Sequence, residues 1–219
     1  MSLADIEFAN NSEPRCPVLL LLDTSGSMFG DKIRQLNQGI FTFKEEIIKD
    51  DVAKKRVEIA IVSFGGEVSL CQDFVTVEKF IPSQLTTNGS TPMGRAIEYG
   101  LDLVESRKVV YKESGIPFYR PWVFLITDGF PTDNWENAAI KVKQYEESNK
   151  ITLFAVGVES ADMDTLAQIS QNTPPVMLRG LSFSEMFIWL SNSMSQVSTS
   201  QTNTQVNLPP IGSWAVAPA

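Results

Sequence analysis

The sequence predicts an α/β fold: a doubly wound, mainly parallel six-stranded sheet with one antiparallel edge strand and helices on both faces. Three observations predict it. Short runs of almost entirely apolar residues recur along the chain, as in strands that helices cover on both faces. Segments with apolar residues at three- and four-residue steps alternate with these runs, which favours amphipathic helices around a parallel sheet. A Gly65-Gly66 pair joins two of the runs as a tight hairpin, which supplies the antiparallel strand.

Six segments are predicted as strands. The first is apolar from Val18 to Leu22 and ends abruptly at Asp23, so we expect it to be buried on both faces. The hairpin makes 67–71 the antiparallel partner of 57–64. The complete set of predicted strands is 17–23, 57–64, 67–71, 121–127, 151–158 and 175–178.

Five segments are predicted as helices. The first shows the pattern most clearly, because its apolar residues fall on one stripe: Ile33, Leu36, Ile40, Phe43 and Ile47. The second begins at Pro92, since proline suits the first helical position. Residues 72–86 are predicted to form an irregular but packed loop. The helix that begins at Pro92 carries a predicted buried stripe from Met93 to Val104, and the other predicted helices cover 31–50, 134–149, 161–171 and 182–197.

The composition indicates one domain with two appendages. We expect a polar lead-in over 1–14, the α/β domain over 15–198, and a polar tail over 199–219. Within the tail, residues 198–205 are rich in Ser, Thr, Gln and Asn, which bury little apolar surface. The following stretch, which contains Trp214, either docks on the domain or a partner, or belongs to a disordered end.

Charge, apolar runs and cysteine content argue against a nucleic-acid-binding, a membrane-spanning and a disulfide-rich secreted protein. The formal net charge is −8, which argues against a nucleic-acid partner. The longest apolar run is far shorter than the roughly 20 residues that span a bilayer, and no secretory signal is recognisable. Two cysteines do not make a disulfide framework, so Cys16 and Cys71 are predicted to be buried hydrophobic residues of a cytoplasmic protein.

The chain contains no histidine, and this narrows the chemistry further. A Ser-His-Asp or Cys-His nucleophile is excluded, as is a zinc site with histidine ligands. Ser25 is therefore interpreted as a ligand or a turn residue rather than as a hydrolytic nucleophile.

Oxygen-bearing side chains follow two of the predicted strands and precede one helix. Asp23-x-Ser25-x-Ser27 follows the first strand, Thr91 precedes Pro92, and Asp128 follows the strand at 121–127. In a doubly wound sheet, loops at the carboxyl ends of strands meet where the strand order reverses. If these two strands are neighbours, both carboxylates face one cavity, and a divalent cation relieves their repulsion. Oxygen ligands favour Mg²⁺, with Mn²⁺ or Ca²⁺ as alternatives.

This constellation resembles the metal-ion-dependent adhesion site (MIDAS) of the von Willebrand factor type A (VWA) domain. The resemblance implies a Rossmann-like fold over about 15–198 and a metal site with one coordination position open to an acidic side chain of a partner protein. The family pattern falls on Asp23, Ser25, Ser27, Thr91 and Asp128. Asp-x-Ser-x-Ser alone is a weak signal, but the combination of all five is specific.

Three further stretches resemble the Y-type proteins of bacterial tellurium-resistance operons. They are Ser2–Phe8, Asn88–Gly94 and Leu125–Asp133. This resemblance implies a cytoplasmic, single-domain bacterial protein that is associated with stress-response gene clusters and has no established enzymatic activity.

Each candidate ligand also has a purely structural interpretation. Asp23 could cap the helix at 31–50, and the two serines could be turn residues around Gly26. Thr91 could be a helix N-cap. Asp133 and Glu136 have the spacing of a capping box for the helix at 134–149, so Asp133 is not counted as a ligand.

Three functions remain in competition. The first is a metal-dependent module that binds an acidic residue of a partner protein. The second is a Mg²⁺-dependent phosphoryl-transfer enzyme with Asp23 as nucleophile. Haloacid-dehalogenase-like phosphatases need an acidic residue two positions on, where this chain has Ser25, and no phosphate-binding glycine motif is present. The third is a scaffold with a purely structural metal.

Overall fold

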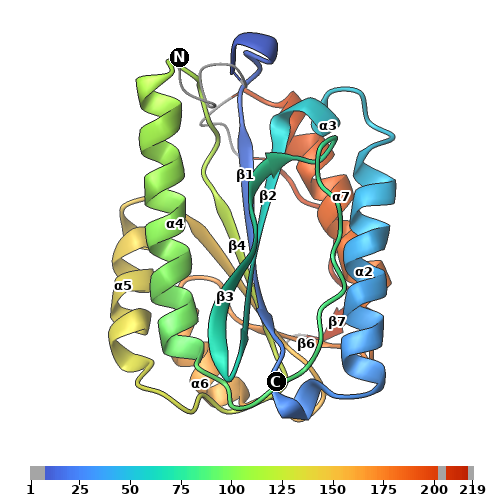
Figure 1. Ribbon diagram of the computed structural model, residues 1–219, viewed down its shortest axis with the longest axis vertical. Coiled ribbons are helices and arrows are strands. Elements are labelled where there is room, and N and C mark those ends of the chain that lie inside the picture. The colour runs from blue at the N-terminus through green and yellow to red at the C-terminus, as the bar shows by residue number, and fades with distance from the viewer. Residues whose placement is uncertain (1–7, 202–205, 217–219) are drawn as a thin grey trace.

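The computed structural model describes residues 8–201 and 206–216. They form a seven-stranded sheet in the order β3-β2-β1-β4-β5-β6-β7, which runs through the middle of the molecule (Figure 1). The strands are β1 (Cys16–Asp23), β2 (Val57–Gly65), β3 (Glu67–Thr76), β4 (Trp122–Thr127), β5 (Thr152–Gly157), β6 (Val176–Leu178) and β7 (Ala215–Val216).

The predicted fold class is confirmed, and the sheet has one strand more than the predicted six. β7 pairs antiparallel with β6, so an antiparallel strand lies at each edge of the sheet. β7 has two residues and follows a polar stretch, so no alternating pattern could reveal it. β3 also continues to Thr76, into the segment predicted to be irregular.

β1 is the centre of the sheet. It pairs in parallel with β2 on one side and with β4 on the other, and all its residues are buried. Leu22 lies opposite Ile126, so β1 and β4 end side by side. The chain leaves β1 for β2 in one direction and reaches β4 in the other, so the strand order reverses between β1 and β4.

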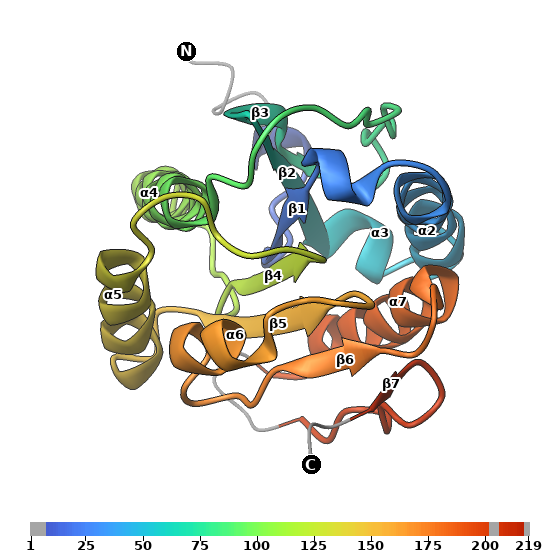
Figure 2. The same cartoon turned by 90° about the horizontal axis from the view of Figure 1, so that it is seen from below.

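Helices cover both faces of the sheet (Figure 2). One face carries α2 (Asp31–Ile47), α3 (Ala53–Arg56) and α7 (Phe183–Thr199), and the other carries α4 (Met93–Glu113), α5 (Glu136–Glu147) and α6 (Met163–Ile169). Successive residues of β1 point to opposite faces: Leu20 belongs to the core beneath α2 and α7, and Leu21 to the core beneath α4 and α5. This alternation explains why β1 is apolar at every position.

The helix bounds differ from the predicted ones by more than two residues in two places. The helix predicted over 31–50 ends at Ile47, and a separate short helix, α3, leads into β2. α4 extends to Glu113, beyond the apolar stripe that predicted it, because Tyr111 in its last turns packs with Phe8 and Ile116 in a separate hydrophobic cluster.

The segment after α7 folds back over the sheet edge at β6. Trp214 is 2% exposed, and its ring centroid lies 5.4 Å from that of Trp189 on α7. The Trp189 indole N–H donates a hydrogen bond of 2.7 Å to the Pro209 carbonyl. These contacts fix residues 206–216 against the domain.

Both cysteines are free thiols, and they differ in burial. Cys16 on β1 is buried, as predicted. Cys71 is exposed, contrary to the prediction, because it lies on the solvent-facing side of edge strand β3. No helix in the described part of the chain is long and apolar enough to cross a membrane.

Candidate metal centre

Three loops meet where the parallel strands end: residues 24–30 after β1, 88–92 before α4, and 128–133 after β4. Figure 2 looks onto this edge, with the turn from β1 to α2 in blue. The Gly26 N–H donates to the Gly89 carbonyl at 3.0 Å, which joins the first loop to the second. The Thr132 N–H donates to the Thr91 carbonyl at 2.9 Å, which joins the second loop to the third. Backbone hydrogen bonds therefore connect the three loops.

Gly89 is required by the close packing of these loops. Its φ is +61°, in the left-handed region that favours glycine. A Cβ on Gly89 would lie 2.6 Å from the Gly66 Cα, closer than real Cβ atoms approach. A side chain here would therefore push the 88–92 loop away from the turn between β2 and β3.

Asp23 is held by the protein on both carboxylate oxygens. Its Oδ1 accepts from the Ser25 backbone N–H at 2.8 Å, and its Oδ2 accepts from the Thr127 hydroxyl at 2.5 Å. The residue is 0% exposed. Burial raises the pKa of Asp23, although the hydrogen bonds from Ser25 and Thr127 oppose this shift. Asp23 does not cap α2, whose N-cap position is Gly30.

Ser25, Ser27 and Asp128 form a chain of hydrogen bonds between the loop after β1 and the loop after β4. The two serine hydroxyl oxygens are 3.0 Å apart. The Ser27 hydroxyl donates to Asp128 Oδ1 at 2.6 Å. Asp128 is 2% exposed, so the bond from Ser27 satisfies a buried carboxylate.

Thr91 completes the set from the side of α4. Its backbone N–H donates to the Thr132 hydroxyl at 3.0 Å, and its carbonyl accepts from the Thr132 N–H at 2.9 Å. The N-cap residue of α4 is Pro92, and its side chain forms no capping hydrogen bond. The alternative in which Thr91 is the N-cap residue is therefore wrong.

The oxygens of three candidate ligands converge beside Gly129. A Cβ placed on Gly129 would lie 3.5 Å from Thr91 Oγ1, 3.6 Å from Ser27 Oγ and 3.9 Å from Asp23 Oδ2. Glycine at this position leaves that space free. Two carboxylates and three hydroxyls, all oxygen donors, fit a small, hard divalent cation.

Lys32 was not identified from the sequence. Its ammonium donates to Asp128 Oδ2 at 2.5 Å and lies 3.1 Å from a carboxylate oxygen of Glu159, which follows β5. Partial burial lowers the pKa of Lys32, but the hydrogen bonds to Asp128 and Glu159 outweigh this and raise it. A lysine in the first turn of α2 is unfavourable for the helix dipole, and this was the available signal for a nearby anion.

Asp133 has a structural role, but on a different helix from the one predicted. Its two carboxylate oxygens accept from the backbone N–H groups of Gly94 and Arg95, each at 2.9 Å, at the start of α4. The predicted capping box for α5 is therefore wrong. Glu136 accepts instead from the Trp135 N–H at 3.2 Å. The bonds from Gly94 and Arg95 to Asp133 connect the 128–133 loop to the start of α4.

A family comparison decides the identity of the fold. The model of the von Willebrand factor type A domain matches residues 18–186, which include all five candidate ligands. The chain belongs to this family. Its VWA domain carries the five side chains at the carboxyl edge of β1 and β4. Among the described residues no group of three or more His, Cys, Asp or Glu could hold a metal.

Solved structures share the VWA fold at low sequence identity. PTMP1 from the mussel byssus, with a zinc-occupied MIDAS motif, is 17% identical with a TM-score of 0.57, and the match covers 84% of this chain and 49% of that one. The pilus adhesin SpaC from Lactobacillus rhamnosus GG is 14% identical with a TM-score of 0.67, covering 85% and 31%. The ArnB paralog VWA2 from Sulfolobus acidocaldarius is 17% identical with a TM-score of 0.55, covering 83% and 46%.

This chain therefore spans about half or less of each of these proteins. At such identities the likeness is one of fold. A comparison with curated protein sequences found no match.

Proposed function

We propose that this VWA domain is a metal-dependent protein-binding module whose cation engages an acidic residue of a partner. The observation that carries the proposal is the convergence of Thr91, Ser27 and Asp23 oxygens beside Gly129. Asp128 and Ser25 join this group through hydrogen bonds to Ser27. The proposed ligand set, acting directly or through water, is Asp23, Ser25, Ser27, Thr91 and Asp128.

The proposed cation is Mg²⁺, with Mn²⁺ or Ca²⁺ as alternatives, because every donor is an oxygen. When bound, it would supply a positive charge that the set offsets only in part, because three of the five side chains are neutral hydroxyls and Asp128 is already paired with Lys32. A partner carboxylate would be attracted to the remaining charge. The zinc-occupied MIDAS motif of PTMP1 supports a divalent cation in this fold. The carboxylate contact would be a hot spot of the interface.

The phosphoryl-transfer alternative is disfavoured by the surroundings of Asp23. A nucleophile needs a free oxygen that faces the substrate, and here both carboxylate oxygens accept hydrogen bonds within a residue that is 0% exposed. We therefore propose a binding module without enzymatic activity. A phosphatase screen with Mg²⁺ tests this, and turnover that disappears in Asp23→Asn would restore the enzyme hypothesis.

The proposal extends to the cellular context. We propose a cytoplasmic role in a bacterial tellurium-resistance or stress-response system, supported by the likeness of Asn88–Gly94 and Leu125–Asp133 to the Y-type proteins. The third stretch of that likeness, Ser2–Phe8, lies outside the described residues except for Phe8. Deleting the gene should sensitise the source organism to tellurite, and the wild-type gene should restore growth where Asp23→Ala does not.

Metal binding is tested first, on the purified chain. Titration calorimetry with Mg²⁺ and Mn²⁺ should show one site in the wild type and none in Asp23→Ala. Asp164→Ala removes an exposed aspartate on α6 and is the matched control, so it should bind like the wild type. Circular dichroism should show that both variants are folded. Wild-type binding by Asp23→Ala would contradict the proposed site.

Partner binding is tested next, by affinity capture from cells with Mg²⁺ or EDTA, followed by binding measurements with the purified partner. Binding should disappear in EDTA and in Asp23→Ala and persist in Asp164→Ala. The scaffold hypothesis makes the opposite prediction: EDTA lowers the melting temperature while the affinity for the partner stays unchanged. Full binding in EDTA would rule out the metal-dependent module.

A further inference from the structure

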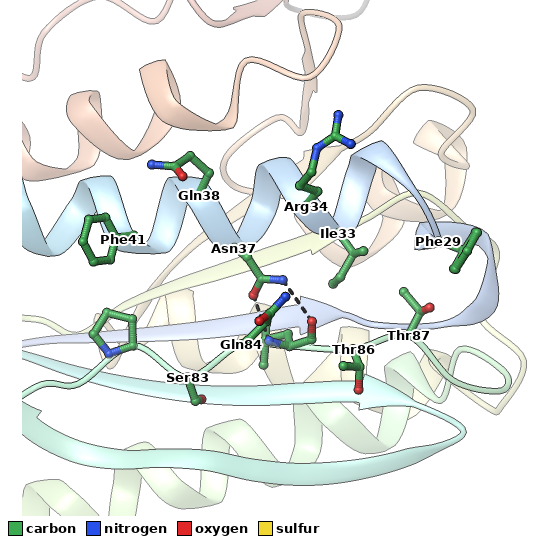
Figure 3. Close-up of a pocket in the computed structure, with 12 residues that line it drawn as sticks. Phe29, Ile33, Arg34, Asn37, Gln38, Phe41, Ser83, Gln84, Thr86 and Thr87 are labelled. Carbon is green, nitrogen blue, oxygen red and sulfur yellow. Dashed lines mark hydrogen bonds between the residues drawn. The ribbon is translucent and has the colours of Figure 1, made fainter.

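A groove of about 600 Å³ lies between α2 and the extended segment 81–87 (Figure 3). The α2 side contributes aromatic and aliphatic side chains: Phe29 is 79% exposed and Phe41 is 47% exposed, with Ile33 between them. Its opposite wall carries hydroxyl and amide groups, such as those of Thr87 and Gln84. Phenylalanine rings on one wall and a mixture of hydrogen-bonding and apolar groups on the other, which includes Pro82 and Leu85, suit a polypeptide.

The opposite wall offers free backbone groups. Asn37 on α2 holds this segment at one point: its amide donates to the Leu85 carbonyl at 2.9 Å and accepts from the Leu85 N–H at 2.8 Å. Within the described part of the chain, the remaining backbone groups of 81–87 form no hydrogen bond with the protein. An extended segment with free C=O groups and, except at Pro82, free N–H groups can pair with an added peptide strand.

Both walls of the groove begin at the candidate metal centre. Phe29 lies two residues after Ser27, and Thr87 directly precedes the 88–92 loop that carries Thr91. Figure 3 shows Phe29 and Thr87 at the same end of the groove, with Phe41 far along α2. From Ile33 to Phe41 the helix rises about 12 Å, which is the length of about four extended residues.

The charge near the groove favours an acidic occupant. Arg34 is the one charged side chain among its lining residues. Its partner Asp31 lies 2.8 Å away, but both side chains are 68% exposed, so this ion pair contributes little and can exchange. Positive charge from Arg34 and from a cation at the metal centre therefore complements a polypeptide with acidic residues.

We propose that the groove receives an extended segment of the partner polypeptide whose acidic side chain engages the metal centre. The inference rests on the proposed function. The segment pairs its backbone with 81–87 and places apolar side chains against Phe29, Ile33 and Phe41. The metal centre thus binds one acidic residue of the partner segment. The groove determines which side chains fit at about four neighbouring positions of that segment.

The probe is a library of random twelve-residue peptides with one fixed Glu, displayed on phage and selected on the purified full chain in Mg²⁺. A library with Gln at the fixed position is selected in parallel. Enriched peptides are synthesised, and their affinity is measured by fluorescence anisotropy. Enrichment of Glu peptides over Gln peptides is the expected result, and equal enrichment would overturn the inference.

Two groove variants are then compared with a matched control. Phe41→Ser and Phe29→Ser remove exposed rings, and Val109→Ser removes a side chain on α4 that is similarly exposed, at 49%. The groove variants should weaken peptide binding at least tenfold, and Val109→Ser should bind like the wild type. Mg²⁺ titration and thermal melts should show that all three variants keep the metal site and the fold.

The outcomes separate the groove from the metal centre. If EDTA and Asp23→Ala abolish peptide binding but both groove variants bind like the wild type, the metal-dependent module stands and the groove inference fails. If peptide binding survives EDTA and Asp23→Ala, the metal-dependent mechanism fails, and with it the inference that rests on it. If peptide binding is lost in EDTA, in Asp23→Ala and in both groove variants, while Val109→Ser binds like the wild type, the metal-dependent module and the groove inference are both supported.

Discussion

Asp128 divides its two carboxylate oxygens between a hydroxyl and an ammonium. Oδ1 accepts from Ser27 and Oδ2 from Lys32. Lys32 thus places a positive charge where a divalent cation would also interact with Asp128. Two cations that share one carboxylate repel each other, and the low exposure of Lys32, 17%, limits the screening of this repulsion by water.

Replacing Lys32 should therefore tighten metal binding. We expect Lys32→Met to raise the affinity for Mg²⁺ about tenfold, because about 1.4 kcal/mol of repulsion corresponds to this factor. Titration calorimetry measures it. Lys49→Met is the control, since Lys49 forms its ion pair with Glu46 at the far end of α2. Unchanged or weaker Mg²⁺ binding in Lys32→Met would show that Lys32 does not compete with the cation.

At the scale of single elements, one buried carboxylate links α5 to the strand that follows it. Glu146 near the end of α5 accepts from the Leu153 N–H of β5 at 2.9 Å through Oε1, and its Oε2 is buried without a hydrogen-bond partner in the described chain. Burial raises the pKa of Glu146 above its ordinary value of 4.5, against the hydrogen bond from Leu153.

The sign of the pH effect follows from this shift. A carboxyl group with a raised pKa binds its proton more tightly in the folded chain than in the unfolded one. Its contribution to stability is therefore most favourable below pH 4.5, and it is lost as the pH rises through the raised pKa. At neutral pH the charged group destabilises the link between α5 and β5.

Glu146→Gln should stabilise the protein at pH 7 by about 1 kcal/mol, or roughly 2–4 °C in melting temperature, because the amide keeps an acceptor for Leu153 and removes a buried charge. The gain should shrink as the pH falls towards 4.5. Thermal melts across this range measure it. Glu147→Gln changes the exposed neighbour and should have almost no effect. A lower melting temperature at pH 7 for Glu146→Gln would contradict this account.

At the scale of the whole molecule, the segment after α7 contributes a large buried ring. Trp214 packs on Trp189, and its indole N–H is buried without a hydrogen-bond partner among the described residues. Trp214→Ala should lower the free energy of unfolding by about 3–5 kcal/mol, since it removes a buried aromatic side chain. Denaturant titration measures the loss.

Trp214→Phe is the matched variant. It keeps an aromatic ring beside Trp189 and removes the unpaired N–H, so it should cost less than half as much as Trp214→Ala. Equal losses for the two variants would indicate that the ring is not what holds residues 206–216 in place.

The arrangement of the domain could be predicted because it depends on local patterns and general rules. Continuous apolar runs predicted buried parallel strands, and the rule for strand ends predicted that Asp23 and Asp128 face each other if β1 and β4 are neighbours, which they are. β7 could not be predicted, since a two-residue strand depends on the edge that it meets.

The partners of the candidate ligands were harder to predict. Thr127 and Lys32 reach Asp23 and Asp128 across 104 and 96 residues of chain, and no local spacing encodes such contacts. For Asp133, a local spacing predicted the wrong partner. Its spacing to Glu136 fits a local capping box, but the fold brings the start of α4 closer, and its exposed N–H groups bind the carboxylate instead.

The ion pair of Lys32 with Asp128 and Glu159 has a consequence for the life of the protein. Many small metal-binding domains stay unfolded until their ion arrives, because their acidic or thiolate groups repel one another without it. Here a newly synthesised chain carries its own counter-ion, so it can finish folding in a compartment poor in free cation. If the proposed cation binds, it would then enter a molecule that is already folded, and its local concentration could act as a signal rather than as a condition for folding.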